Sequence, residues 1–209
     1  MSGKATPIAV MLSGSGRTLV NLCERIDAGD VPARVAVVIA SKECLGVERA
    51  RERGVPVVVE PGTIAADRLE ALLRSHGAEW VVLAGYLKIV HIPRAFEGRV
   101  VNIHPALLPA FGGPGMYGDR VHRAVLEHGC KVAGCTVHLC DERYDAGPIV
   151  LQRVCEVRDD DTPESLAARV FELEKQAYPE ALRSLLEGRV VVDGRRTRIL
   201  APSHANRGA

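Results

Sequence analysis

The sequence predicts an α/β fold of the Rossmann-like kind, in which helices cover both faces of a mostly parallel, twisted sheet and are followed by a long C-terminal helix and a β-hairpin. Short apolar runs alternate with helical patterns through residues 8–101, which is the order of elements that builds a parallel sheet. The run at residues 34–40 is apolar nearly throughout, as expected for a strand covered on both faces. Near the C-terminus Thr162-Pro163 precedes a long helical pattern, and these residue types favour the N-cap and the first helical position.

The first half of the chain contains the alternating elements. We expect strands at residues 8–12, 34–40, 55–59, 80–84 and 100–101, and helices at residues 19–26, 45–53 and 65–75. Gly54 ends the second of these helices. Because strand–helix–strand units are right-handed and bind ligands beyond the carboxyl ends of their strands, the functional site is expected at that edge of the sheet.

The pattern changes after residue 101. We expect a helix at residues 119–128, strands at 131–140 and 149–157, a helix at 163–186, and a hairpin over 190–200 with Asp193-Gly194 as its turn pair. The glycine-dense segment at residues 111–118 predicts either a lid or a close approach of the backbone to a ligand. Residues 202–209 are expected to form a flexible tail.

Composition narrows the class of partner. The 27 Lys and Arg residues nearly balance the 26 Asp and Glu residues, so no global charge favours a nucleic acid or an anionic membrane. No segment has the length and apolarity of a membrane span or a secretory signal, and we expect a cytoplasmic protein with reduced cysteines. We expect no metal, because Cys130, Cys135 and Cys140 would be spread along one extended strand.

A glycine loop follows the first predicted strand and opens the first predicted helix. Free backbone N–H groups at a helix start favour an anion, and small residues allow it to approach closely. The loop lacks the third glycine of a dinucleotide fingerprint, since Leu19 occupies that place, and Ser41-Lys42 stand where a ribose-binding acid is expected. We therefore favour a single phosphate, with a tight turn that binds no ligand as the alternative.

A polar pair, Asn102 and His104, stands where the apolar strand at residues 100–101 stops. Side chains two residues apart in extended backbone point to the same face, so the amide and the imidazole could form an oxyanion hole with a proton donor. Asp145 lies in an acidic turn after a later strand and would favour the imidazolium form of the histidine. The alternatives are a histidine that belongs to the core and an acidic turn that is simply solvated.

The other histidines are assigned from their context. We expect surface positions for those in helices, connections or the tail, which are His76, His91, His122, His128 and His204. His138 lies in the middle of a predicted strand and belongs either to the core or to the wall of the crevice.

Four ordered motifs resemble those of the phosphoribosylglycinamide formyltransferases, in the folate-dependent formyltransferase superfamily. They lie at residues 83–90, 101–109, 134–138 and 145–152, and the resemblance covers nearly the whole chain. It implies transfer of a formyl group from the cosubstrate 10-formyltetrahydrofolate to the amine of glycinamide ribonucleotide in purine biosynthesis, without a metal. The implied partners are these small molecules, and the sequence leaves monomer and homodimer open.

The resemblance also implies roles for individual residues. Asn102 and His104 would stabilise the oxyanion, His104 would donate a proton, and Asp145 would raise the pKa of His104 and move a proton through water. Glu174 would face the glycinamide end. The substrate phosphate would be held by Gly14, Ser15, Gly16, Arg17 and Thr18. The folate pocket would be lined by Leu87, Lys88, Ile89, Val90, Asn102, Cys140, Asp141 and Glu142, with the rest of the turn up to Asp145.

The same resemblance predicts one domain over residues 1–209, with a phosphate-binding half at 1–100, a catalytic and folate-binding half at 101–201, and the tail. Three features depart from the family pattern: Arg17 in the glycine loop, a longer segment between residues 109 and 120, and no arginine in residues 61–66, where Lys88 or Arg68 could replace it. The rival readings are a formyltransferase acting on an amino sugar or methionyl-tRNA, a formyltetrahydrofolate deformylase, and a nucleotide-binding oxidoreductase or sensor.

Overall fold

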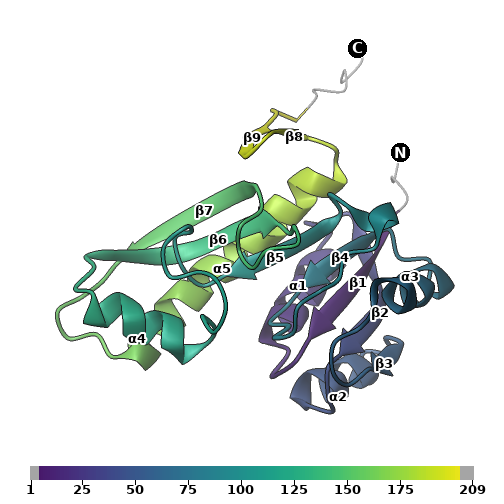
Figure 1. Ribbon diagram of the computed structural model, residues 1–209, viewed down its shortest axis with the longest axis horizontal. Coiled ribbons are helices and arrows are strands. Elements are labelled where there is room, and N and C mark those ends of the chain that lie inside the picture. Colours follow the sequence, from purple (N-terminus) through teal and green to yellow (C-terminus); the bar gives the residue numbers. More distant parts are fainter. Residues whose placement is uncertain (1–4, 203–209) are drawn as a thin grey trace.

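A seven-stranded sheet runs through the computed structural model, which describes residues 5–202 (Figure 1). The strand order is β3-β2-β1-β4-β5-β6-β7. Strands β1 to β5 are parallel, whereas β6 and β7 run antiparallel to their neighbours, so the prediction of a mostly parallel sheet is confirmed. The strands are β1 (Thr6–Leu12), β2 (Ala33–Ala40), β3 (Val57–Val59), β4 (Trp80–Leu83), β5 (Val100–His104), β6 (Val132–Leu139) and β7 (Ile149–Glu156).

Helices cover both faces of this sheet, as predicted. They are α1 (Arg17–Asp27), α2 (Leu45–Glu52), α3 (Ala66–Ser75), the 3₁₀ helix η1 (Arg94–Phe96), α4 (Asp119–Glu127) and α5 (Pro163–Leu186). The central strand β1 shows why the strands are apolar throughout: Ile8, Val10 and Leu12 pack in the core with α1, α2 and α5, while Ala9 and Met11 pack in the core with α3. Because side chains alternate across a strand, both faces of β1 must be apolar.

The strand order reverses direction at β1, and this reversal locates the crevice. From β1 the chain first builds outward through β2 and β3, then returns to place β4 and β5 on the other side. The segments that leave β1 and β4 at their carboxyl ends lie side by side, since Ser13 N–H donates to the Gly85 carbonyl at 3.1 Å. Such a reversal opens a crevice beyond the strand ends, where ligands of this fold class bind.

The long helix α5 is anchored at its start and in its middle. Thr162 is the N-cap, and its side chain and that of Ser165 exchange hydrogen bonds with each other's backbone N–H, which satisfies two N–H groups that a helix start leaves without partners. Further along, the buried Tyr178 hydroxyl lies 2.8 Å from the Leu83 carbonyl and 3.0 Å from the Val101 carbonyl. The helix therefore contacts the end of β4 and the first half of β5.

Two predictions of local structure differ from the observed elements. β3 begins at Val57, two residues later than predicted, because Val55 N–H bonds to the Ala50 carbonyl as part of the exit from α2. The hairpin consists of β8 (Val190–Asp193) and β9 (Arg196–Ile199), with Asp193 paired to Arg196. Its turn residues are therefore Gly194 and Arg195, and the prediction of Asp193-Gly194 was wrong by one residue; the φ of +58° falls on the glycine.

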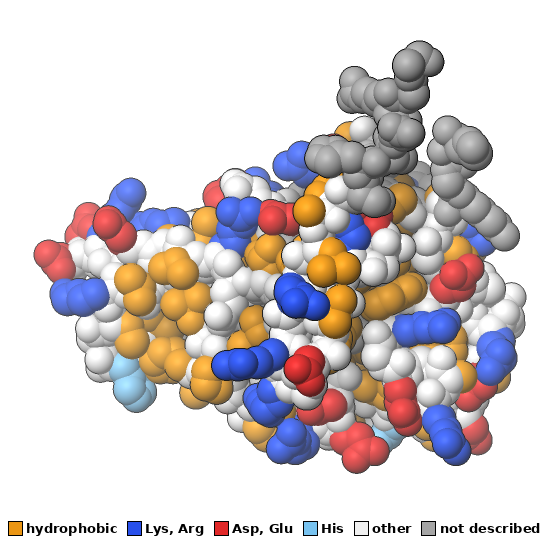
Figure 2. Space-filling view, turned by 90° about the horizontal axis from the view of Figure 1, so that it is seen from above, with side chains coloured by type: hydrophobic (Ala, Val, Ile, Leu, Met, Phe, Trp, Pro, Cys, Tyr) orange, Lys and Arg blue, Asp and Glu red, His pale blue; other side chains and the backbone are white. Residues whose placement is uncertain are grey.

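The surface shows no dominant charge on the face seen in Figure 2, where basic and acidic side chains are interspersed and apolar ones gather in the half that holds β6 and β7. Within residues 5–202, every helix is too short or too polar to cross a membrane. The predicted tail lies, from residue 203 on, outside the described residues, and so does His204.

Candidate active site

One cleft of about 470 Å³ opens at the carboxyl ends of the strands. Its walls come from segments far apart in the sequence: residues 14–18 after β1, 83–90 after β4, 102–105 in and after β5, 113–119 before α4, 140–145 after β6, and one face of α5. The glycine loop and the Asn102/His104 pair therefore share one crevice, as predicted. The residues predicted to bind the phosphate, the folate and the amine, and those predicted to take part in catalysis, line this cleft.

Asn102 and His104 are the third and last residues of β5, so the strand extends through the polar pair instead of stopping before it. Both side chains line the cleft, in agreement with the predicted common face. Opposite them runs β6, whose antiparallel register places His138 directly across from Asn102. The Asn102 amide nitrogen lies 3.1 Å from Nε2 of His138.

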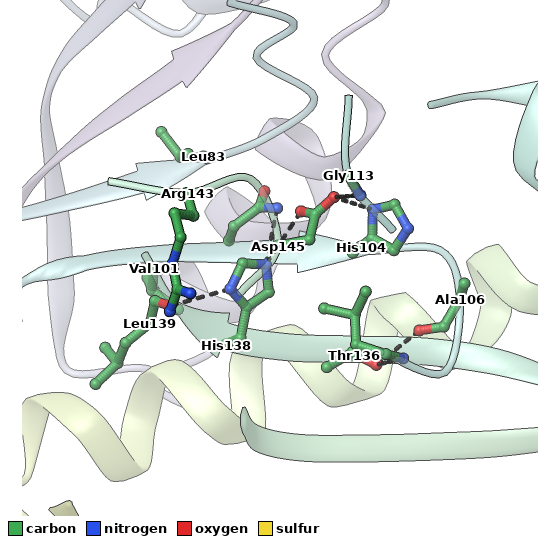
Figure 3. Close-up of polar contacts among 12 residues, drawn as sticks. Leu83, Val101, His104, Ala106, Gly113, Thr136, His138, Leu139, Arg143 and Asp145 are labelled. Atoms are coloured by element: carbon green, nitrogen blue, oxygen red, sulfur yellow. Dashed lines mark hydrogen bonds and ion pairs between the residues drawn. The ribbon is translucent and has the colours of Figure 1, made fainter. Parts of the chain in front are cut away.

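Asp145 joins the two histidines (Figure 3). Its Oδ2 lies 3.6 Å from Nδ1 of His104, and its Oδ1 lies 3.5 Å from Nε2 of His138. The backbone N–H of Gly113 donates to the same carboxylate at 2.8 Å. Asp145 has a φ of +52°, a conformation that aspartate tolerates better than most residues, and this directs the carboxylate into the cleft from the turn.

The hydrogen-bond partners assign the tautomers of both imidazoles. Nε2 of His104 lies 2.8 Å from the Phe111 carbonyl and must donate to it. In the neutral ring Nδ1 then faces Asp145 without a proton, and protonation would turn this contact into an ion pair. His138 donates from Nδ1 to the Leu139 carbonyl at 3.0 Å, so its Nε2 accepts from Asn102.

Asp145 raises the pKa of His104, as predicted, but burial has the larger and opposite effect. Burial of the ring, which is 4% exposed, lowers the pKa of His104 below 6.5, and the opposing effects of Asp145 and the Phe111 carbonyl do not outweigh it. For Asp145, burial alone would raise the pKa, but the contacts with His138 and His104, when these rings are protonated, and the hydrogen bond from Gly113 N–H hold it below its usual value. At neutral pH the site therefore holds an aspartate anion beside a largely neutral imidazole.

The prediction of a surface position for His122 was wrong, because this side chain is buried. It lies on the inner face of α4, where it is 4% exposed, and it lines the cleft. Its Nδ1 has no hydrogen-bond partner among the described residues, and burial lowers its pKa, with Asp119 opposing the shift. Its helical neighbours Val121 and Val125 are buried as well, and this pattern is the sequence signal that could have placed His122 inward.

The glycine loop is shaped by a close contact with α2. Gly16, the N-cap of α1, has a φ of +73°, and a Cβ there would lie 2.6 Å from the Cα of Gly46. Only glycine meets both demands. No side chain caps α1, so the first-turn N–H groups lack intrahelical acceptors and remain available to an anion at the cleft.

The segment at residues 87–90 and the turn at residues 140–145 form further walls of the cleft. Leu87 N–H donates to the Ser13 hydroxyl at 3.0 Å, which ties the first of these walls to the glycine loop. Lys88 lines the cleft. Arg68 does not line it and pairs instead with Glu60 at 2.9 Å.

Glu174 enters the cleft from α5, together with Ala167 and Phe171. Burial raises the pKa of its carboxyl group to about 7, and the nearby Arg17 limits the rise. Within the described chain, no cluster of three His, Cys, Asp or Glu side chains has metal-binding geometry. Cys135 is buried within β6, whereas Cys130 and Cys140 lie beyond its opposite ends.

Residues 6–182 match the family model described as formyl transferase. The chain belongs to the formyl transferase family. This formyl transferase is 42% identical over 193 residues to the chloroplastic phosphoribosylglycinamide formyltransferase of Arabidopsis thaliana. The alignment covers 88% of this chain and 66% of the plant protein. It thus spans just under two thirds of that relative's length.

Two further relatives match this formyl transferase over most of both chains. The phosphoribosylglycinamide formyltransferase of Haemophilus influenzae is 35% identical over 192 residues, which is 88% of each protein. The crystal structure of glycinamide ribonucleotide transformylase 1 from Symbiobacterium toebii superposes with a TM-score of 0.88 at 42% identity, covering 95% of this chain and 96% of that one.

The cleft of this formyl transferase brings N–H donors together with a carboxylate. An amide, an imidazole and an aspartate converge from β5 and the turn after β6. Such donors stabilise a developing oxyanion, and a neighbouring carboxylate can accept or relay a proton. These are the groups that acyl transfer to an amine requires.

Proposed function

We propose that this formyl transferase moves the formyl group of 10-formyltetrahydrofolate to the amine of glycinamide ribonucleotide, a step of purine biosynthesis. The observation that supports it most is the convergence of Asn102, His104 and Asp145 in one cleft with the glycine loop. The relatives named phosphoribosylglycinamide formyltransferase support the choice of acceptor. A cytoplasmic location and partners limited to small molecules belong to the same proposal.

In the proposed reaction the acceptor amine attacks the formyl carbon, and a new C–N bond forms as the carbonyl oxygen takes up the negative charge. The amide of Asn102 and the imidazole N–H of His104 stabilise that oxyanion. For Nε2 of His104 to do so, its present bond to the Phe111 carbonyl must be exchanged for one to the substrate. The bond from the formyl carbon to the folate nitrogen then breaks.

Proton transfer completes the proposed step. The attacking amine loses one proton and the departing folate nitrogen gains one, so the products are the N-formyl acceptor and tetrahydrofolate. Asp145 is ionised and accepts the proton of the attacking amine through a water molecule. Asp145 then passes this proton to Nδ1 of His104, which lies 3.6 Å away. The resulting imidazolium, whose lowered pKa makes it a ready donor, releases its Nε2 proton to the leaving nitrogen.

The remaining walls of the cleft divide between the two substrates in this proposal. The phosphate of the acceptor lies at residues 14–18, where free N–H groups and Arg17 meet it, and Glu174 faces the glycinamide. The folate lies between residues 87–90 and the turn at 140–145. This pocket is apolar along Leu87, Ile89 and Val90 and polar at Asp141 and Glu142, which fits an aromatic ring system with hydrogen-bonding edges.

A direct assay tests the proposal. The protein is mixed with 10-formyltetrahydrofolate and glycinamide ribonucleotide, and release of tetrahydrofolate is followed together with the mass of the formylated acceptor. Parallel reactions contain an amino sugar nucleotide, methionyl-tRNA or no acceptor. The proposal requires acceptor-dependent release with glycinamide ribonucleotide. Formate release without any acceptor would instead indicate a deformylase, and preference for another amine would reassign the substrate.

A further inference from the structure

Arg17 adopts an unusual position for a surface arginine. It is the first residue of α1 and lines the cleft, and its guanidinium carbon lies 4.4 Å from the centre of the Phe171 ring. Among the described residues it forms no ion pair, whereas Arg51 and Arg68 each pair with a glutamate at 2.9 Å. The positive charge of Arg17 is therefore held in place by an aromatic face and is not neutralised by a carboxylate.

The Phe171 ring that contacts Arg17 lies on the face of α5 that lines the cleft. Ala167, Phe171 and Glu174 line the cleft from α5, and their spacing of four and three residues places them on one face of that helix. Nearby, the Asn21 side chain donates to the Lys175 carbonyl at 3.2 Å, which ties α1 to α5. The distance between the α1 start and the Phe171 ring is thus fixed by two packed helices.

We propose that Phe171 is a positioning residue that sets specificity for a phosphorylated acceptor, by holding the Arg17 guanidinium beside the free N–H groups at the start of α1. This inference rests on the proposed function and deepens it. An aromatic ring attracts the cation without cancelling its charge, so an arriving phosphate dianion meets a full positive charge.

Stacking on Phe171 orders the Arg17 guanidinium before the phosphate binds, which lowers the entropic cost of binding. A free arginine side chain loses rotamer entropy when it is ordered, and a guanidinium already stacked on a ring has lost part of it before the ligand arrives. The stacked face leaves the N–H groups at the guanidinium edge for the phosphate oxygens. Glu174, whose pKa burial raises to about 7, competes less for Arg17 than an ordinary carboxylate would.

The test separates this role from the chemistry. Ribose 5-phosphate is titrated into the full-length protein by calorimetry, for the wild type and for Phe171→Leu, Phe171→Tyr and Arg17→Met. Tetrahydrofolate is titrated into the same proteins. Lys175→Ala is the matched control, because the Lys175 ammonium lies 5.9 Å from the same ring but outside the cleft and is paired with Glu172.

Phe171→Leu should weaken ribose 5-phosphate binding about two- to five-fold, the effect of losing one cation–π contact, and Arg17→Met about ten-fold or more. Phe171→Tyr and Lys175→Ala should both bind ribose 5-phosphate with wild-type affinity. Tetrahydrofolate affinity and kcat at saturating acceptor should not change in Phe171→Leu, while KM for glycinamide ribonucleotide rises with the dissociation constant.

Unchanged ribose 5-phosphate affinity in Phe171→Leu would overturn the inference, and so would an equal loss of tetrahydrofolate affinity, which indicates a general structural role. Because binding is measured without turnover, the result does not depend on the reaction. A wild-type protein that binds ribose 5-phosphate but formylates no amine would refute the proposed function alone.

Discussion

Nδ1 of His104 and Oδ2 of Asp145 lie 3.6 Å apart in a pocket where both side chains are at most one-tenth exposed. With the proton of the neutral imidazole on Nε2, a lone pair of Nδ1 faces the carboxylate. Protonation of His104 would convert it into a buried ion pair. One proton can therefore be held by either residue of this pair, and a relay between an attacking and a leaving nitrogen requires such a pair.

Loss of either member of this pair should reduce turnover strongly. His104→Ala and Asp145→Asn should each lower kcat by about 10²- to 10⁴-fold, the usual contribution of a positioned acid or base, with little change in the melting temperature. Turnover is measured as tetrahydrofolate release. Asp159→Asn is the control, since Asp159 is exposed and pairs only with Lys131. Near-normal turnover in both site variants would remove the assigned roles.

The buried histidines should make the protein less stable in mild acid. Burial lowers the pKa of His104 and of His122 below 6.5, so on acidification the unfolded chain takes up these protons before the folded protein does. The contribution of these histidines to the free energy of unfolding should therefore fall as pH drops from about 7 toward 5. It is measured by urea denaturation at each pH in Glu174→Gln, because the raised pKa of Glu174 acts in the opposite direction over the same range.

His122→Leu isolates one of these contributions. The substitution removes a buried Nδ1 that has no partner in the described structure, and an unsatisfied buried polar group costs about 1–3 kcal/mol. The variant should be at least as stable as the wild type at pH 8, and its advantage should grow toward pH 5. An advantage that shrinks on acidification would contradict the assigned direction of the His122 pKa.

Glu174 should have the opposite effect with pH. Because burial raises the pKa of its carboxyl group from 4.5 to about 7, the folded protein retains this proton over a range where the unfolded chain has lost it. The stability that Glu174 provides is present below pH 4.5 and is lost as pH rises through about 7. Glu174→Gln should be more stable than the wild type by about 3 kcal/mol at pH 8, and this advantage should vanish as pH falls below 4.5. An advantage that does not change between about pH 8 and about pH 4 would refute the raised pKa.

The Tyr178 hydroxyl should stabilise the contact of α5 with β4 and β5. It is fully buried and lies within hydrogen-bond distance of the carbonyls of Leu83 and Val101. Tyr178→Phe leaves both without this donor and should cost about 1–3 kcal/mol, seen as a lower melting temperature. Ser75→Ala removes a hydroxyl bonded to one carbonyl at a helix end near the surface and should cost less. A loss in Tyr178→Phe no greater than in Ser75→Ala would show that the bridge contributes little.

Local patterns were sufficient for much of this protein. The apolar run at residues 34–40 and its neighbours predicted the parallel sheet, since a strand covered on both faces must be apolar throughout. Thr162-Pro163 predicted the start of α5, because capping depends on adjacent residues. The common face of Asn102 and His104 followed from the two-residue period of a strand. Each of these inferences needs only residues close in sequence.

Other features were decided only by tertiary structure. His138 reaches Asn102 because β6 runs antiparallel to β5 in one particular register, and no residue near either of them specifies that register. The His104 pKa falls although Asp145 is adjacent, since the balance between desolvation and charge depends on everything that surrounds the ring. Sequence by itself determined which groups the protein has and which strand ends hold them; the packing of distant segments determined their protonation and their partners.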